Sequence, residues 1–286
     1  MQVVDIGVNC AGPHFPTEED VQSAVRDARV NGVFPLIAIS NSLAESAKNR
    51  AMCADLLPKG ALFHTVGVHP EHASDVADVD ELFAALESVD ATACVAVGEC
   101  GLDYKFLDNK AQQQAVFDAQ IRFAQAKALP LYLHCRDAYE DFVALLKRRE
   151  CSHGVVHCFT GMVFFLHYCP CVCLTCALRL PCDVIVGSPD QARELLDMGF
   201  FFGITGWLLD MRRNRDLVAA LEEVIPLDRV LVETDTPWLS VDRRRPSRPT
   251  DVLVILARVA ELKGVSLEAA RDQVLANTLA LFPKLR

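Results

Sequence analysis

The stretch VAVGE, residues 95–99, is an apolar run that ends in a residue able to bind a metal ion. Three more apolar runs along the chain end in such a residue. LYLH ends at His134, VVH ends at His157, and VLVETD ends at Asp235. The carboxyl ends of parallel strands meet at one face of a barrel, so these endings predict four side chains gathered in one place. Carboxylate and neutral imidazole groups together hold divalent cations that activate water. The pattern therefore predicts a hydrolytic metal site.

Strand-like apolar segments alternate with helix-like amphipathic segments from one end of the chain to the other. Residues 17–30 and 110–127 are typical helical segments, and residues 251–282 predict two closing helices with a stop at Gly264. Eight βα units predict a parallel sheet closed into a TIM (β/α)8 barrel with its site at the carboxyl ends of the strands. The expected strands are residues 3–9, 33–40, 62–69, 94–99, 131–134, 155–159, 200–205 and 230–235.

A doubly wound open sheet is the structural alternative to the barrel. Such a sheet carries a glycine-rich turn after its first strand, where a dinucleotide binds. The corresponding turn, NCAGPHF at residues 9–15, holds a single glycine. The sequence therefore favours the barrel.

Composition narrows the class of protein. The 286 residues are 51% hydrophobic and 23% charged, which is enough apolar surface for a large core and excludes global disorder. The net charge of -10 disfavours nucleic-acid binding through a generally basic surface, so a phosphate substrate must be met locally. Because the candidate ligands span residues 99–235 and must meet, we expect residues 1–286 to form one domain. The first residues resemble no export signal, which predicts a cytoplasmic location, or the nucleus in a eukaryote.

The twelve cysteines fit a reducing compartment better than a disulfide framework. Three of them, Cys100, Cys135 and Cys158, directly follow candidate ligands. Neighbours in a strand point to opposite faces, so these thiols should face outward as small packing groups beneath helices.

Residues 163–187 do not follow the alternation of strand and helix. This cysteine-rich apolar segment is slightly short for a membrane span and contains Pro170, and its C-x-C-x-C-x2-C spacing does not match common zinc sites. We interpret it as an insertion without a catalytic role. A translated intron would produce the same pattern.

Other polar residues also lie near the expected site. Arg136 follows His134 by two residues and shares its face, where a guanidinium can bind an oxyanion in bidentate fashion. His69 ends the third strand and either orients a phosphate or is a rim histidine. Glu233 lies on the same face as Asp235 but deeper, as a hydrogen-bonding or structural partner. The arginine-rich run at residues 243–248 is either a solvated loop or a positive patch for a nucleic-acid backbone.

Seven motifs in the correct order closely resemble the TatD family of metal-dependent deoxyribonucleases. The resemblance implies a TIM-barrel metallohydrolase that cleaves DNA phosphodiesters, with roles in DNA degradation and repair. It also implies that Glu99, His134 and His157 bind metal, that Asp235 is both ligand and catalytic base, and that His69 and Arg136 contact substrate. The motifs are DIGVN (5–9), GVHP (67–70), GECGLDY (98–104), HCRDA (134–138), HCFTG (157–161), GITGW (203–207) and ETDTPWL (233–239).

Two departures from the family pattern stand out. Many members carry a His-x-His pair on the first strand, where this chain has Gly7 and Asn9, so one tightly held ion and a weaker second one are expected. Arg248 precedes Pro249 where relatives often show Asn-Glu-Pro.

These observations predict a monomeric, divalent-metal-dependent deoxyribonuclease that acts as a 3′–5′ exonuclease on single-stranded DNA. The expected ion is Mg²⁺, with Mn²⁺ or Zn²⁺ as alternatives. No membrane partner is expected. Two other hypotheses stay open: an amidohydrolase-like enzyme acting on an amide, ester or lactone, and an inactive homologue disrupted by the insertion.

Overall fold

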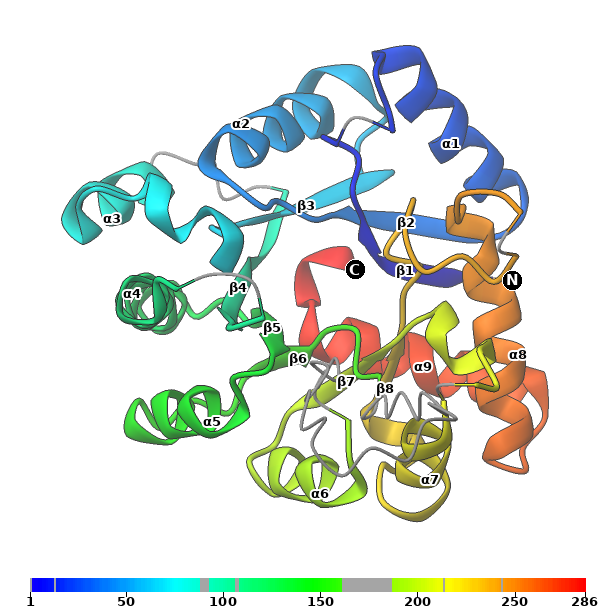
Figure 1. Ribbon diagram of the computed structural model, residues 1–286. Helices are drawn as coiled ribbons and strands as arrows, with labels where there is room; N and C mark the ends of the chain where they lie inside the picture. The colour runs from blue at the N-terminus through cyan, green and yellow to red at the C-terminus, as the bar shows by residue number, and fades with distance from the viewer. Residues whose placement is uncertain are drawn as a thin grey trace, which may run out of the picture.

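The computed structural model describes residues 2–12, 14–87, 93–105, 108–160, 187–212, 214–242 and 244–286. Its eight parallel strands form one sheet in the order β1 to β8, and helices surround the sheet (Figure 1). The strands are β1 (Val3–Val8), β2 (Val33–Ala38), β3 (Leu62–Val66), β4 (Cys94–Asp103), β5 (Leu131–Arg136), β6 (Gly154–Val156), β7 (Phe201–Ile204) and β8 (Val230–Val232). The helices are α1 (Glu18–Val30), α2 (Leu43–Ala51), α3 (Val79–Glu87), α4 (Lys110–Lys127), α5 (Tyr139–Arg148), α6 (Pro189–Asp197), α7 (Arg215–Glu223), α8 (Val252–Leu262) and α9 (Leu267–Leu281). Shorter helical turns are η1 (Met52–Leu56), η2 (Pro70–Asp75), η3 (Gly206–Leu209), η4 (Leu227–Arg229), η5 (Pro249–Asp251) and η6 (Pro283–Leu285).

The first and last strands meet at their carboxyl ends. Val8 forms a parallel bridge with Thr236, and the N–H of Asn9 donates to the carbonyl oxygen of Thr236 at 2.9 Å. The sheet therefore curves into a (β/α)8 barrel, which confirms the expected fold.

Local sequence signals explain where several helices begin and end. Thr17 caps α1: its side chain accepts from the N–H of Asp20 at 3.2 Å, and the Asp20 carboxylate accepts from the N–H of Thr17 at 3.0 Å. This reciprocal pair satisfies amide groups that a helix start leaves unbonded. Gly264 follows α8 with a φ of 62°, the left-handed conformation that commonly ends a helix. The expected helices at these places are confirmed.

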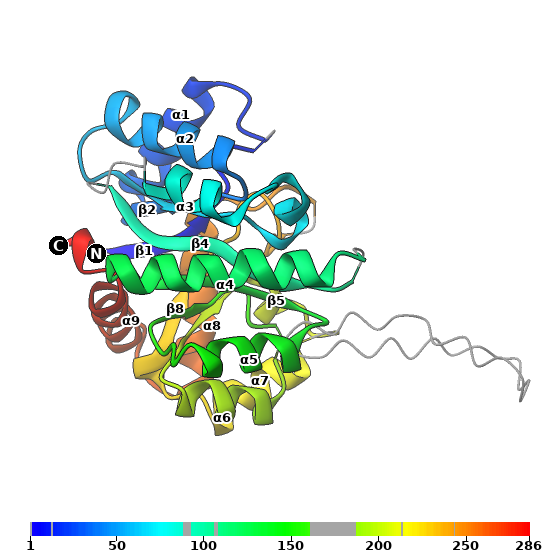
Figure 2. The ribbon, with the colours of Figure 1, turned by 90° about the vertical axis from the view of Figure 1, so that its left-hand side faces the viewer.

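The apolar core has two layers. The larger layer lies between the strands and the helices around them. The smaller layer gathers inward-facing strand residues with the end of α9, among them Val4, Ile6, Ile37, Val95, Tyr132, Val155, Leu231, Leu281 and Phe282. Lys284 donates to the carbonyl oxygen of Cys94, the first residue of β4, at 2.8 Å. Residues 281–285 therefore cover the amino-terminal end of the barrel, and Figure 2 places both termini at that end. The opposite end is left for the site.

Strand β4 is four residues longer than the segment expected at 94–99. It continues past Glu99 and pairs Gly101 with His134 and Asp103 with Arg136. A Cβ on Gly101 would lie only 1.8 Å from the carbonyl oxygen of His134, so a side chain at this position would keep β4 and β5 apart. Gly101 therefore permits the close pairing of these two strands.

Seven cysteines in the described ranges are free thiols. Cys100 and Cys135 are buried in the larger core layer, as expected for packing groups. Cys158 differs: it is half-buried and lines the cavity at the carboxyl end of the barrel. It lies beyond β6 and has a φ of 48°, so the alternation of a strand does not set its direction.

Of the insertion expected at 163–187, only Gly187 falls within the described residues, and the rest of that prediction lies outside them. Within the described parts of the chain, every helix is too short or too polar to cross a lipid bilayer.

Candidate functional site

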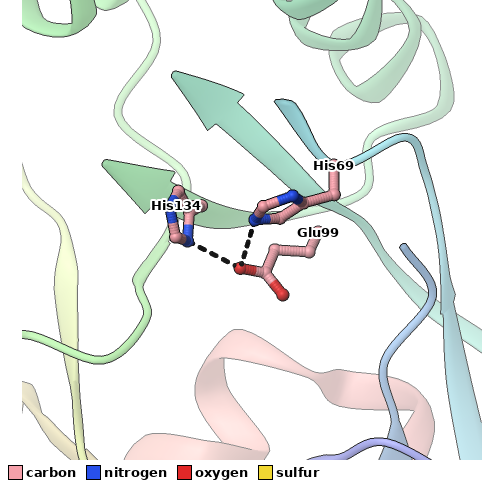
Figure 3. A group of neighbouring side chains, drawn as sticks. All are labelled: His69, Glu99 and His134. Carbon is pink, nitrogen blue, oxygen red and sulfur yellow. Dashed lines mark hydrogen bonds and ion pairs between the residues drawn. The ribbon is translucent and has the colours of Figure 1, made fainter. Parts of the chain in front are cut away.

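Glu99 lies at the centre of a cluster of imidazoles at the carboxyl end of the barrel. Its Oε1 atom is 2.8 Å from Nδ1 of His134, 3.3 Å from Nε2 of His157 and 3.5 Å from Nε2 of His69. Figure 3 shows the side chains of His69 and His134 pointing at this carboxylate. His69 follows β3, His134 lies in the second half of β5 and His157 follows β6, so segments far apart in sequence converge on one oxygen atom.

Burial and neighbouring charges both shift the pKa values of the side chains in this cluster. Burial alone would raise the pKa of Glu99, but the neighbouring imidazoles of His157, His69 and His134 outweigh burial and hold its pKa well below the ordinary value. Burial lowers the pKa of His69 to about 3, which favours its neutral form. Burial also opposes protonation of His157, yet the carboxylates of Glu99 and Glu233 raise its pKa well above the ordinary value. The cluster therefore keeps Glu99 ionised at neutral pH.

Asp235 lines the same cavity, which has a volume of about 690 Å³. Its Oδ1 accepts from Nδ2 of Asn9 at 2.9 Å, and Asn41 in turn donates to Oδ1 of Asn9 at 3.3 Å. Burial raises the pKa of Asp235 to about 7. Asn9 thus orients this carboxylate.

Arg136 is anchored beside the cluster by a carboxylate that sequence reasoning gave no role. Its Nη2 lies 2.5 Å from Oδ2 of Asp103, and the same oxygen lies 3.3 Å from Nε2 of His134. Glu71 lies farther from Nη2, at 3.8 Å. Asp103 occupies the position opposite Arg136 in the β4–β5 pairing, so it holds both the guanidinium and the second nitrogen of an imidazole.

A second buried carboxylate supports His157 from inside the barrel. Glu233 is fully buried, and its Oε1 lies 3.1 Å from Nδ1 of His157 and accepts from the N–H of Cys158 at 2.6 Å. The hydroxyl of Tyr132 donates to the other oxygen of Glu233 and lies 3.0 Å from Nδ1 of His157. Glu233 therefore contacts a proposed ligand directly, which is the deeper position expected from the sequence. Tyr132 was not expected in the site, although it precedes His134 by two residues and so shares its face.

Two arginines of the run beside β8 pair with acids that lie close to them in the sequence. Arg244 pairs with Asp242 at 3.0 Å, and Arg245 pairs with Asp251 at 2.6 Å. Arg243 lies outside the described residues. These pairs favour the interpretation of a solvated, internally bonded loop over that of a concentrated positive patch.

The donor atoms suit a divalent cation. One ligand atom each from His69, Glu99 and His134 lies within 4.8 Å of the other two. His157 contacts the same glutamate oxygen, and Asp235 borders the same cavity. Imidazole nitrogen with carboxylate oxygen is a donor set that Zn²⁺, Mn²⁺ and related ions accept. The structure brings all four expected ligands to one cavity and adds His69 to the candidate set.

Comparison with known proteins identifies the family. The sequence model of the family described as TatD related DNase matches residues 4–283. The chain is 33% identical to the 3′–5′ ssDNA/RNA exonuclease TatD of Klebsiella pneumoniae (strain 342), with 97% of each chain covered. It is 36% identical to the protein of the same name from Cronobacter sakazakii, covering 98% of this chain and 97% of the relative.

Solved structures agree with this assignment. A TatD homologue from Escherichia coli K12 superposes with a TM-score of 0.81 at 26% identity and covers 98% of both chains. A TatD-family hydrolase from Entamoeba histolytica has a TM-score of 0.79 at 23% identity, covers 99% of this chain and 98% of its own, and supports the fold. The chain belongs to the TatD-related DNase family of metal-dependent hydrolases, which act on phosphodiester bonds.

Proposed function

We propose that this chain is a 3′–5′ exonuclease that removes nucleotides from single-stranded DNA with Mg²⁺ as its ion, Mn²⁺ or Zn²⁺ being the alternatives. The proposal is supported by one observation above others: a buried carboxylate oxygen faces three imidazoles in a cavity that also contains Arg136 and Asp235. The polarity and the preference for single strands come from relatives whose names specify a 3′–5′ ssDNA/RNA exonuclease.

Glu99, His134, His157 and Asp235 would hold the ion, with His69 either as a further ligand or as a contact for substrate phosphate. When bound, such an ion lowers the pKa of water and offsets the charge of a phosphodiester. The neutral imidazole of His69 is suited to either role, because its bare ring nitrogen can bind a cation and its N–H can donate to a phosphate oxygen.

The remaining steps are assigned to side chains of the site. Arg136 binds a non-bridging phosphate oxygen, and Asp103 fixes its guanidinium at 2.5 Å so that little side-chain freedom is lost when substrate binds. Asn9 holds Asp235 through Oδ1, and we assign Oδ2 as the atom that accepts a proton from the attacking water. The three carboxylates thus differ in their tasks: Glu99 would bind the ion, Asp235 would bind the ion and accept a proton, and Asp103 orients Arg136.

We further propose that residues 1–286 act as one domain, which is supported by the single sheet that the eight strands form. We also propose that the protein is a monomer in the cytoplasm. Size-exclusion chromatography with light scattering checks the oligomeric state. A dimer mass would contradict this part of the proposal without affecting the catalytic assignment.

The activity is tested with oligothymidylate that carries a fluorophore on its 5′ end. A 3′–5′ exonuclease shortens the labelled strand one nucleotide at a time, and EDTA should stop the reaction. Glu99→Ala and Asp235→Ala should each lower the rate by at least about 100-fold, since removal of one stabilising group typically costs that much. Asp190→Ala, at an exposed position on α6, serves as the matched control and should keep the parent rate. Equal rates for Glu99→Ala and the parent chain would refute the proposal.

A further inference from the structure

A second cavity continues from the site and contains both tryptophans of the chain. The sequence has two tryptophans, Trp207 and Trp238, and each lines both the site cavity and a neighbouring cavity of about 660 Å³. Leu239 also borders the two cavities. The aromatic pair therefore lies at the boundary between the carboxylate–imidazole cluster and the adjoining space, which we call the tryptophan cleft.

The two tryptophans lie in the turns that follow the neighbouring strands β7 and β8. In the turn after β8, the backbone N–H of Trp238 donates to the carbonyl oxygen of Asp235 at 2.8 Å. In the turn after β7, the backbone N–H of Trp207 donates to Oγ1 of Thr205 at 3.3 Å. Each tryptophan is thus tied by its backbone to a turn that also shapes the site.

The turn after β7 packs closely against the turn after β8. A Cβ on Gly206 would lie 2.1 Å from the carbonyl oxygen of Leu239, so only glycine lets the turn after β7 approach the turn after β8 this closely. The walls of the tryptophan cleft are therefore fixed relative to the site before any ligand binds, which lowers the entropic cost of binding.

The cleft exposes apolar and aromatic surface beside a polar site. Trp238 is 54% exposed, and Met211, which also lines the cleft, is 89% exposed. The ring of His14 meets the indole of Trp238 edge-on, with centroids 5.1 Å apart and planes at 84°. An exposed indole held in place by its backbone and a neighbouring ring is suited to stack a flat ligand.

The charges of the lining do not favour phosphate as the main ligand of this cleft. Arg212 pairs with Asp210 at 3.1 Å, and Arg245 pairs with Asp251 at 2.6 Å. Because each cation already faces a carboxylate, the cleft offers aromatic surface more than net positive charge. Stacking on aromatic side chains accepts any base, since every nucleobase has a π-face.

We propose that the tryptophan cleft stacks a nucleobase of the single strand adjacent to the phosphodiester at the Glu99 cluster. The inference rests on the proposed nuclease function, because that function places a nucleic-acid strand at the cluster. Trp238 provides the exposed stacking face, and Trp207 forms the wall shared with the site.

Intrinsic fluorescence reports on this cleft directly, because both tryptophans of the chain lie there. The full chain is titrated, with Mg²⁺ and separately with EDTA, using oligothymidylate whose phosphorothioate linkages resist hydrolysis. An abasic strand of the same length, linkage and charge is the matched probe. Quenching by oligothymidylate and a much weaker response to the abasic strand are the expected results.

Variants separate stacking from a structural role. Trp238→Ala should weaken oligothymidylate binding by about 5–150-fold, the equivalent of about 1–3 kcal/mol for one stacked base, while Trp238→Phe should stay within a few-fold of the parent. Circular dichroism checks that both variants fold, and Val254→Ala on exposed α8 surface is the control. The phenylalanine variant keeps the test meaningful if the alanine variant fails to fold.

The outcomes distinguish this inference from the proposed function. Equal quenching by the thymidylate and abasic strands, with nuclease activity intact, would overturn base stacking and leave the nuclease in place. Base-dependent quenching in a chain without nuclease activity under any ion would overturn the function and leave the cleft as a nucleobase site. Capture of an apolar peptide or a second copy in preference to oligothymidylate would also overturn the inference.

Discussion

Replacing Gly7 with alanine should perturb the buried Tyr132–Glu233 pair inside the barrel. A Cβ at this position on β1 would lie 2.5 Å from Oη of Tyr132 and 2.9 Å from Oε2 of Glu233. Both side chains are fully buried and hydrogen-bonded to each other, so neither can move without breaking a contact. Overpacking of this kind costs about 1–3 kcal/mol, partly offset by the about 0.4–1 kcal/mol that alanine gains through a less flexible unfolded chain. We expect Gly7→Ala to lower the free energy of unfolding by about 1–2 kcal/mol.

A double-mutant cycle with Tyr132→Phe tests the cause. This second change removes the atom nearest to the new methyl group but takes a donor from Glu233, and should cost about 1–3 kcal/mol alone. The 2.5 Å contact is absent in the double variant. The double variant should therefore lose less free energy of unfolding than the two single variants lose in sum, by at least about 0.5 kcal/mol.

Urea unfolding followed by circular dichroism, in EDTA to remove the contribution of bound ion, measures the four proteins of the cycle. Gly12→Ala is the matched control, since its Cβ would meet a single atom, the carbonyl oxygen of Asn9, at an ordinary 3.4 Å. It should change stability by no more than about 0.5 kcal/mol. Strict additivity in the cycle, or equal effects at Gly7 and Gly12, would refute the steric argument.

Two further predictions concern the carboxylates that support the fold and the site. Glu233→Gln keeps the shape of the side chain but removes the negative charge 3.1 Å from Nδ1 of His157. The affinity for Mn²⁺, measured by calorimetry, should therefore fall about 10–100-fold. Unchanged affinity would show that Glu233 does not orient this imidazole. Asp118→Asn removes the partner of Arg149 at 2.6 Å and should cost about 0.5–1 kcal/mol at neutral pH. Because Arg149 lowers the pKa of Asp118 in the folded chain, this contribution is present above the unfolded pKa of about 3.9 and is lost as pH falls through the lower folded value. Unfolding curves of parent and variant that differ equally at neutral and strongly acidic pH would contradict this account.

The barrel could be predicted from sequence because its signals are local and repeated. Each strand is a short apolar run, and α4 (Lys110–Lys127) matches the expected bounds, with buried residues recurring from Gln113 to Ala124. The end of β4 was placed wrongly because glycine in isolation indicates a turn. Whether Gly101 turns or pairs depends on its neighbour His134, which local sequence does not specify.

The sequence predicted which residues lie together at the carboxyl end of the barrel, but it did not predict their contacts. Strand endings identified Glu99, His134, His157 and Asp235 without any knowledge of distances. The role of Asp103 depends on β4 extending to pair with β5, and the position of His69 beside Glu99 depends on the turn before η2. Such contacts join residues from different strands, so they follow from the closed barrel and not from any single segment.

The pairs of the arginine-rich run were missed for a different reason. Asp242 and Asp251 flank the run in the sequence, and each was close enough to pair with Arg244 or Arg245. Counting only the cations suggested a basic patch. Charges of opposite sign within a few residues of each other have to be counted together before a loop is assigned to a polyanion.

The covering of the amino-terminal end of the barrel by residues 281–285 has a consequence for biosynthesis. The inner core includes Leu281 and Phe282, and β1 meets the turn after β8, so segments made first find their partners only after most of the polypeptide has left the ribosome. Such long sequence separation slows folding and leaves apolar strands open to solvent during translation.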